Sequence, residues 1–213
     1  DEFGLDIMYP LMSSIIFCPE YGFFDAATTF AQKNLLIGSI LSVFPFAQYF
    51  GVVLFGRIAD RIGRKKSLYI TTLGSVCGFL FSGIAAQLHS YPLLFASRVV
   101  TGFFASNTLV CFAALADIST TEKERARHFG SIGFIAGACW LVATLVGGVM
   151  SQERYGGSLS AAVPFYIAAI IVLCSTLFLM RFFEETFTPV QKPRLGFFSG
   201  LLEGFKRSRK KNL

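Results

Sequence analysis

The chain has 213 residues, of which 54% are hydrophobic and only 15% are charged, whereas soluble chains carry about 25% charged residues. Its charged residues leave long uncharged runs at 34–56, 67–97, 99–116, 129–152 and 155–180, and apolar runs of this length are typical of membrane spans. This pattern excludes a soluble enzyme, a disordered tail and a disulfide-stabilised secreted domain. The net charge of +6 does not indicate a nucleic-acid binder, because Lys and Arg lie in short segments between apolar runs.

Six membrane-spanning helices are predicted. The first, residues 3–18, would be about 24 Å long, which is short of the ~30 Å hydrocarbon core, so we expect the start of this span to be missing. The second covers about 35–55. The third and fourth lie on either side of a turn at 87–92, in which Pro92 suits a first helical turn, and the fourth continues through Arg98 to about Leu115. The fifth and sixth cover about 129–151 and 161–180.

The chain therefore divides into a six-span bundle, residues 1–181, and a tail, residues 182–213. In the tail, apolar residues recur at the spacing of an amphipathic helix and are followed by a basic run, residues 206–211. We expect a linker whose helix lies on an anionic membrane surface. A solvated linker is the alternative.

The distribution of positive charge predicts the orientation in the membrane. Five Lys and Arg residues lie in the loop between spans 2 and 3, three between spans 4 and 5, and eight from Arg181 to the end of the chain, which together are 16 of the 19. Positively charged loops face the cytoplasm. We therefore expect both loops and the tail to be cytoplasmic, in a plasma or inner membrane.

The loop after the second span carries the most specific motif. Its glycines permit a tight turn and its charged residues can form ion pairs; the motif residues are Gly56, Asp60, Arg61, Gly63, Arg64, Lys65 and Lys66. This motif resembles the signature loop of the major facilitator superfamily of secondary transporters. The resemblance implies that Asp60 caps a helix of another half of the protein and that Arg64 pairs with Asp117. An ordinary positively charged loop is the alternative.

Other segments support this resemblance. Arg98 to Gly102 is similar to the family's fourth-span Arg-x-x-x-Gly motif, and residues 117–130 are similar to the loop of its tetracycline-efflux branch. Asp1, Gly4 and Pro10 resemble a first-span pattern of drug/proton antiporters. The resemblance implies an all-helical bundle with a three-plus-three inverted repeat. Because members of the family have twice as many spans and about twice as many residues, it also implies that a second six-span half is missing.

Charged and polar residues inside the spans are candidates for proton coupling and substrate contact. A carboxylate at the bilayer centre costs about 2.5–3.5 kcal/mol, so Asp1, Glu2 and Asp6 are expected to exchange protons, unless Asp1 and Glu2 form a solvated helix end. Spans 1 and 4 correspond in the family's repeat, so Arg98 could face a cavity shared with Asp6 and stabilise a charged carboxylate there. A static structural pair is the alternative.

Two further polar residues and two glycine pairs lie within spans. Gln48 and Asn107 could contact substrate or form helix–helix hydrogen bonds. The pairs Gly74 with Gly78 and Gly133 with Gly137 predict small-residue packing faces.

The resemblance implies a proton-coupled transporter that works by alternating access and exports a drug or metabolite by antiport. Its partners would be a small-molecule substrate, protons, the lipid bilayer and the second half. One departure counts against export, because Ala143 and Thr144 stand where drug antiporters have Gly-Pro before a glycine pair. A proton-driven importer of a nutrient or siderophore, and a non-transporting receptor or structural partner, remain alternatives.

Catalysis is not expected. The five cysteines have no paired or metal-ligand spacing, and they are expected to be small core residues. No Gly-rich phosphate-binding motif is present, so ATP hydrolysis by this chain is not expected. We therefore expect no cofactor and no metal.

Overall fold

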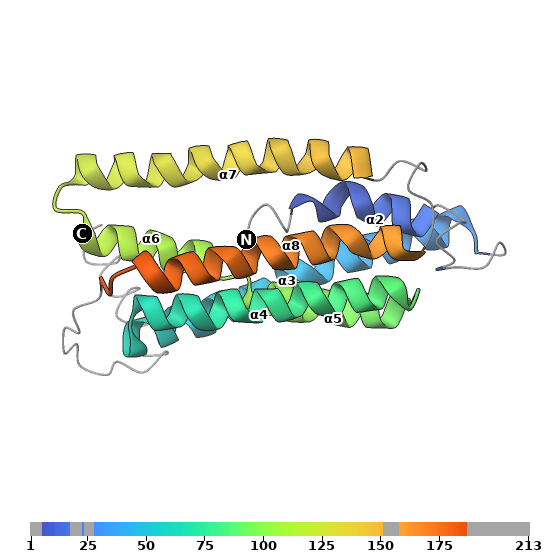
Figure 1. Ribbon diagram of the computed structural model, residues 1–213, viewed down its shortest axis with the longest axis horizontal. Coiled ribbons are helices and arrows are strands. Elements are labelled where there is room, and N and C mark those ends of the chain that lie inside the picture. Colours follow the sequence, from blue (N-terminus) through green and yellow to red (C-terminus); the bar gives the residue numbers. More distant parts are fainter. Residues whose placement is uncertain (1–5, 18–22, 24–27, 151–157, 187–213) are drawn as a thin grey trace, which may run out of the picture.

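The computed structural model describes residues 6–17, 23, 28–150 and 158–186. Within them the chain forms helices that run roughly along one axis, and no strand (Figure 1). The predicted all-helical fold is therefore confirmed. The helices are α2 (Met8–Phe17), α3 (Phe30–Ile62), α4 (Arg64–Gln87), α5 (Tyr91–Phe104), α6 (Asn107–Ile118), α7 (Glu122–Met150) and α8 (Ser158–Phe182).

Helix α3 is longer than the predicted second span at both ends. It begins with a capping box, in which the Thr29 hydroxyl accepts a hydrogen bond from the Gln32 amide and the Gln32 side chain accepts one from the Thr29 amide. Such a cap satisfies two amides that lack partners within the helix. At the other end one residue, Gly63, separates α3 from α4, with φ of 102°. A glycine suits this corner because other residues rarely adopt positive φ.

Glycines let α5 pack directly against the backbones of α3 and α4. A Cβ atom added to Gly51 of α3 would overlap the Phe103 carbonyl, and one added to Gly102 of α5 would overlap the Phe44 carbonyl. Added Cβ atoms at Gly74 and Gly78 of α4 would overlap side chains of α5. The predicted packing face at Gly74 and Gly78 is confirmed.

The predicted fourth span is present, but the sequence did not predict a break in its helix. The helix stops after Phe104 and starts again at Asn107, so α5 and α6 are separated by Ala105 and Ser106. Gly102, a poor helix former, precedes the interruption. The Ala105 carbonyl accepts a hydrogen bond from the Gln48 side chain at 2.7 Å. This bond stabilises the interruption, because a released carbonyl inside a membrane must find a partner within the protein.

The core lies between α4, α5 and α8, where Phe79 and Phe165 are fully buried, and it extends to α2 and α3. Helix α7 lies along one side of the bundle, with α2 and α6 beneath it (Figure 1). It contacts α2 at Gly147, where an added Cβ would meet Pro10 and Ile7. Gly133 and Gly137, predicted to form a packing face, have no described atom within 4 Å of an added Cβ.

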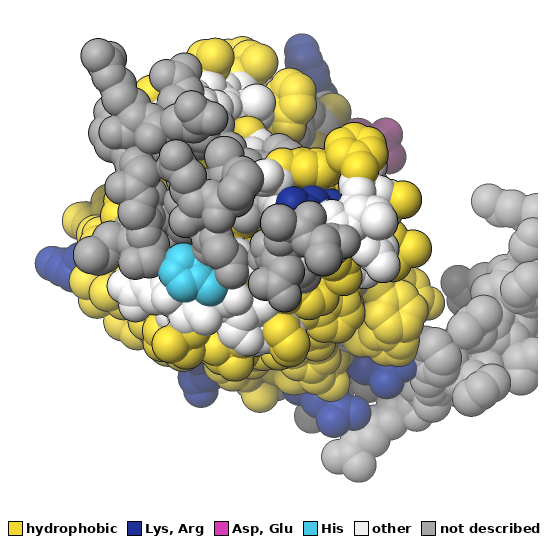
Figure 2. Space-filling model, turned by 90° about the vertical axis from the view of Figure 1, so that its right-hand side faces the viewer, with side chains coloured by type: hydrophobic (Ala, Val, Ile, Leu, Met, Phe, Trp, Pro, Cys, Tyr) yellow, Lys and Arg dark blue, Asp and Glu magenta, His cyan; other side chains and the backbone are white. Residues whose placement is uncertain are grey.

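Five helices of the described residues are long and apolar enough to cross a membrane, with α5 and α6 counted together as residues 91–118. In an end-on view, hydrophobic side chains predominate among the described residues around the lower edge of the bundle (Figure 2). Helix α2 has 10 residues, or about 15 Å, and covers only part of the predicted first span.

The contact between α3 and α5 can be tested with two alanine variants of one helix. Gly51→Ala forces a Cβ atom into the Phe103 carbonyl, and overpacking of this kind costs about 1–3 kcal/mol, so we expect a lower Tm for the purified full-length protein. Gly38→Ala is the control, because a Cβ there meets no atom within 4 Å, and its Tm should stay equal or rise, since Ala favours helix. Equal Tm values for both variants would contradict the close contact.

Candidate functional site

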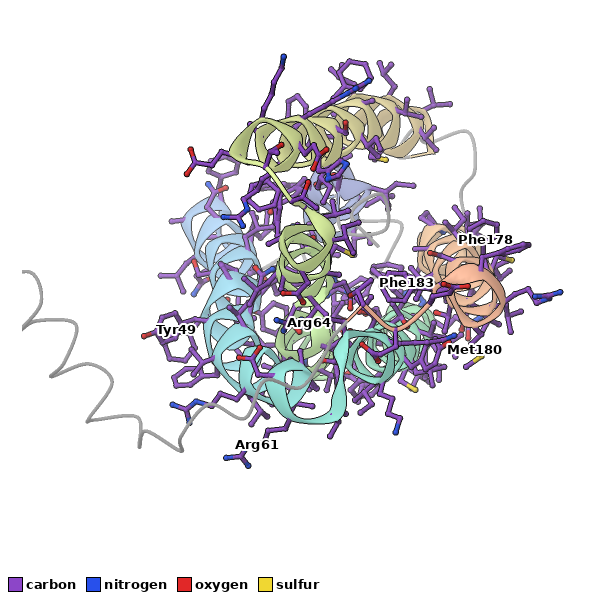
Figure 3. The ribbon with its side chains drawn as sticks, turned by 90° about the vertical axis from the view of Figure 1, so that its left-hand side faces the viewer. Tyr49, Arg61, Arg64, Phe178, Met180 and Phe183 are labelled. Carbon is purple, nitrogen blue, oxygen red and sulfur yellow. The ribbon has the colours of Figure 1, made fainter. Side chains whose placement is uncertain are left out.

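Three helices meet at Arg64, the first residue of α4. Its Nε donates to Oδ2 of Asp117 in α6 at 2.9 Å, and its Nη1 lies 2.8 Å from Oδ1 of Asp60 in α3. Arg64 is 8% exposed, while the side chains of Asp60 and Asp117 are 64% and 30% exposed. The predicted pairing of Arg64 with Asp117 is therefore present. Figure 3 shows Arg64 among these helices.

A fourth segment joins this network through Glu185, which follows α8. One carboxylate oxygen of Glu185 accepts the Arg64 backbone amide at 2.8 Å, and the other accepts the Lys65 amide at 3.2 Å. Gly63, the residue before α4, has no side chain with which to cap the helix. Glu185 thus acts as the N-terminal cap of α4, at the positive end of the helix dipole.

Sequence reasoning missed Glu185. The only sequence signal is that two acids, Glu184 and Glu185, follow the last apolar run, and a carboxylate suits the N-terminus of a nearby helix. Which helix it reaches depends on the packing of α8 against α4, which no local pattern of residues specifies.

The other residues of the signature loop have different surroundings. Arg61 is exposed and points away from the bundle (Figure 3). Lys66 is exposed, and the Lys65 ammonium lies 5.9 Å from the centre of the Tyr69 ring. Gly56 faces Leu109 of α6 at an ordinary contact distance of 3.6 Å from an added Cβ. Of the predicted loop residues, Arg64 therefore pairs with Asp117, and Asp60 joins the network through Arg64.

An apolar cluster lies beside the charged network. Ala59 of α3, Leu68 of α4 and Val110 of α6 are buried together, with Leu179 and Phe183 packed against them. Because this cluster contains residues of the same four segments as the charged network, the end of the bundle is closed by both charges and apolar side chains.

Arg98, in α5, lies in the interior of the bundle. It is 3% exposed, its guanidinium donates a hydrogen bond to the Ser82 hydroxyl of α4, and its Cζ lies 5.6 Å from the centre of the Phe165 ring in α8. The Ser82 hydroxyl lies 2.7 Å from the Gly78 carbonyl and 3.0 Å from the Ser97 hydroxyl, either of which can accept its one hydrogen. In the described part of the chain, Arg98 has a hydroxyl and an aromatic face as partners and forms no ion pair.

The first-span candidates are only partly described. Asp6 is half-buried just before α2, and α2 packs against α7 and α3, whereas Arg98 faces α4 and α8. The cavity that Arg98 was expected to share with Asp6 stays a prediction. Asp1, Glu2 and the amphipathic segment at 198–205 lie outside the described residues.

The two polar candidates of the spans lie at the interruption between α5 and α6. Gln48 bonds to the Ala105 carbonyl, and Asn107 is the first residue of α6 and 7% exposed. Gln48 thus forms a helix–helix hydrogen bond, one of the two roles expected for it.

The chemistry of this arrangement is electrostatic. Among the described residues no group of three or more His, Cys, Asp or Glu side chains could hold a metal ion. The network around Arg64 contains one guanidinium and three carboxylates from separate segments, and such pairs can separate and form again as helices move.

Comparisons with known proteins identify the family to which the sequence is similar. The sequence model of the Major Facilitator Superfamily matches residues 3–212. The chain is 26% identical over 189 residues to the class H tetracycline resistance protein of Pasteurella multocida, covering 87% of this chain and 42% of that protein. It is 28% identical over 176 residues to the multidrug resistance protein MdtG of Serratia proteamaculans, covering 83% and 41%.

A solved structure has a similar fold. The human organic anion transporter MFSD10 (TETRAN) aligns with a TM-score of 0.67 at 17% identity, covering 93% of this chain and 48% of that one. The chain thus spans less than half the length of these relatives.

The cap on α4 gives a test with a neighbouring control residue. Glu185→Gln removes the charge that faces two amides, and Glu185→Ala removes both acceptors. Since loss of a helix cap costs about 0.5–2 kcal/mol, we expect Glu185→Ala to lower the Tm of the full-length protein and Glu185→Gln to lower it less. Glu184 is also exposed but, among the described residues, does not bond to the amides of α4 that Glu185 caps, so Glu184→Ala should leave the Tm unchanged. Equal effects of the two alanine variants would rule out the capping role.

Proposed function

Because this chain belongs to the Major Facilitator Superfamily, we propose that it is the N-terminal half of a proton-coupled transporter that exports a small molecule by alternating access. The family match and the apolar helices make it an integral membrane protein. The observation that carries the proposal is the network around Arg64, which lies at one end of a bundle of the transporter family and can open by separation of charges.

The proposed second half follows from length and exposure. The chain corresponds to about two-fifths of the tetracycline resistance and multidrug relatives. Helix α3 has exposed large apolar residues at Phe46, Tyr49 and Phe50, and α7 is largely exposed along its length. We assign these faces to the second half and to lipid.

The cycle that we propose uses two charged regions. Rocking of the halves around a midplane site requires that the end closed by Arg64, Asp60 and Asp117 opens once per cycle. Asp6 and the charge of Arg98 are the proposed proton-coupling groups, with Asp1 and Glu2, and a charge kept in hydrocarbon despite its cost indicates a function. The excess of basic residues supports the proposal that the Arg64 end faces the cytoplasm, in a cell membrane.

Export is proposed because named relatives confer tetracycline or multidrug resistance. The absence of a Gly-Pro pair at Ala143 and Thr144 makes import by symport the second candidate, because a proline would remove a backbone donor and kink α7 there. Helix α7 runs unbroken through both positions.

The proposed function is tested by flux measurements on the full-length protein in lipid vesicles with an imposed pH gradient, with tetracycline and a panel of organic cations and anions as substrates. We expect counterflow of protons and substrate. Substrate movement in the direction of the proton gradient would support the importer, and no flux with any substrate would support a receptor or structural role.

The gate residues give a sharper prediction within that assay. Asp117→Asn removes the charge that pairs with Arg64, so we expect about tenfold slower flux, equivalent to ~1.4 kcal/mol, with normal expression. Glu122→Gln is the matched control, since Glu122 is an exposed acid at the start of the next helix, α7. A similar loss in both variants would exclude a specific role for Asp117.

A further inference from the structure

Helix α6 connects the two polar regions described above. Its first residue, Asn107, follows the interruption of the fourth span, and Asp117, next to its last residue, pairs with Arg64. With 12 residues, α6 is about 18 Å long. The interruption and the charged network are therefore the two ends of one short helix.

The two halves of the fourth span are held in different ways. Helix α5 packs directly on backbone and side chains at Gly51, Gly78 and Gly102, where added Cβ atoms would overlap neighbouring atoms. Helix α6 meets α3 at Gly56 through an ordinary van der Waals contact. Its polar attachments in the described residues include the pair at Asp117 and, just before its start, the Gln48 bond to Ala105. Close backbone packing fixes α5, while side-chain contacts leave α6 easier to displace.

We propose that Gln48 is a positioning residue that controls α6: the helix moves as a rigid rod about Ala105 and Ser106, so that the Gln48–Ala105 hydrogen bond and the Arg64–Asp117 ion pair form and break together. The inference relies on the proposed transport function only for its flux measurement. It changes the role of Gln48 from a substrate contact to a residue that acts through the backbone of the fourth span.

The interruption has the groups that such a movement needs. In a membrane an unpaired carbonyl is costly, so Ala105 cannot lose the Gln48 amide unless another donor replaces it. Ser106 is 1% exposed, and its hydroxyl has no hydrogen-bond partner among the described residues. A buried serine hydroxyl beside the interruption is a spare donor for a carbonyl that is released when α6 moves.

A double-mutant cycle tests the coupling in the full-length protein. Gln48→Met keeps the side-chain length but removes the donor, and Asp117→Asn removes the charge at the other end of α6. Independent sites at this distance combine to within about twofold of the product of their separate effects. We expect each single variant to slow flux. The double variant should transport no more slowly than the slower single variant, and its flux should be at least threefold higher than the value obtained by multiplying the two separate effects.

Tyr91→Phe provides the control for this cycle. The Tyr91 hydroxyl joins α5 to α3 by hydrogen bonding with Ser39 at 2.5 Å and donating to the Leu36 carbonyl at 3.1 Å, but it lies at the start of α5, far from α6. Its effect should multiply with that of Asp117→Asn. If the effects of Gln48→Met and Asp117→Asn on flux also multiply, the proposal is overturned.

A distance measurement tests the same inference without transport. Spin labels at Ile70 of α4 and Ile118 of α6, both exposed, report the position of α6 in a cysteine-free background, and labels at Val53 and Val99 report α3 against α5. Gln48→Met should broaden or shift the first distance distribution and leave the second unchanged. Gln48→Leu, which likewise has no donor, should do the same if the first variant folds poorly. Unchanged α4–α6 distances in a folded variant would refute the inference, whereas absence of flux in the wild type would refute only the transport function.

Discussion

Backbone amides and carbonyls inside a membrane have no water to bond, so each must find a partner within the protein. Long helices meet this requirement along most of the chain. Where a helix starts or is interrupted, side chains bond to the backbone groups that lack a partner within the helix. At the start of α4, Gly63 has no capping side chain and the Glu185 carboxylate takes its place. At the interruption of the fourth span, the Gln48 amide bonds to the Ala105 carbonyl. Both partners come from segments distant in sequence, which ties helix ends to the packing of the whole bundle.

The two buried arginines are stabilised by different environments. Arg64 lies at the end of the bundle, where carboxylates that are partly exposed can approach it from α3 and α6, and exposed charges exchange partners at little cost. Arg98 lies in the interior, where the Ser82 hydroxyl and the Phe165 ring are its neighbours. An arginine held by neutral groups keeps its positive charge available, so it remains able to attract an anion or a carboxylate in another state of the protein.

The sequence was sufficient for properties that depend on composition and local pattern. Uncharged runs predicted the helices, Pro92 the start of α5, and the signature loop the pairing of Arg64 with Asp117. It was insufficient where tertiary contacts decide. No proline marks the interruption at Ala105 and Ser106, which depends on a hydrogen bond from a residue 57 positions earlier, and Glu185 reaches its helix only because α8 packs on α4. For Arg98, the motif identified a buried cation but not its partners.

Packing strength divides the bundle in a way that suits movement. Glycine contacts join α3, α4 and α5, and the α4–α8 interface buries the large aromatic residues. Helix α7 instead contacts α2 and α6, while glycines on its exposed face at 130, 133 and 137 have no described neighbour. A rigid unit next to a more loosely attached one can change shape by displacement of α6 and α7 without repacking of the core, because well-packed interiors resist continuous deformation. The charged network at Arg64 joins α6 to that rigid unit, so its ion pairs lie where a small displacement would change them most.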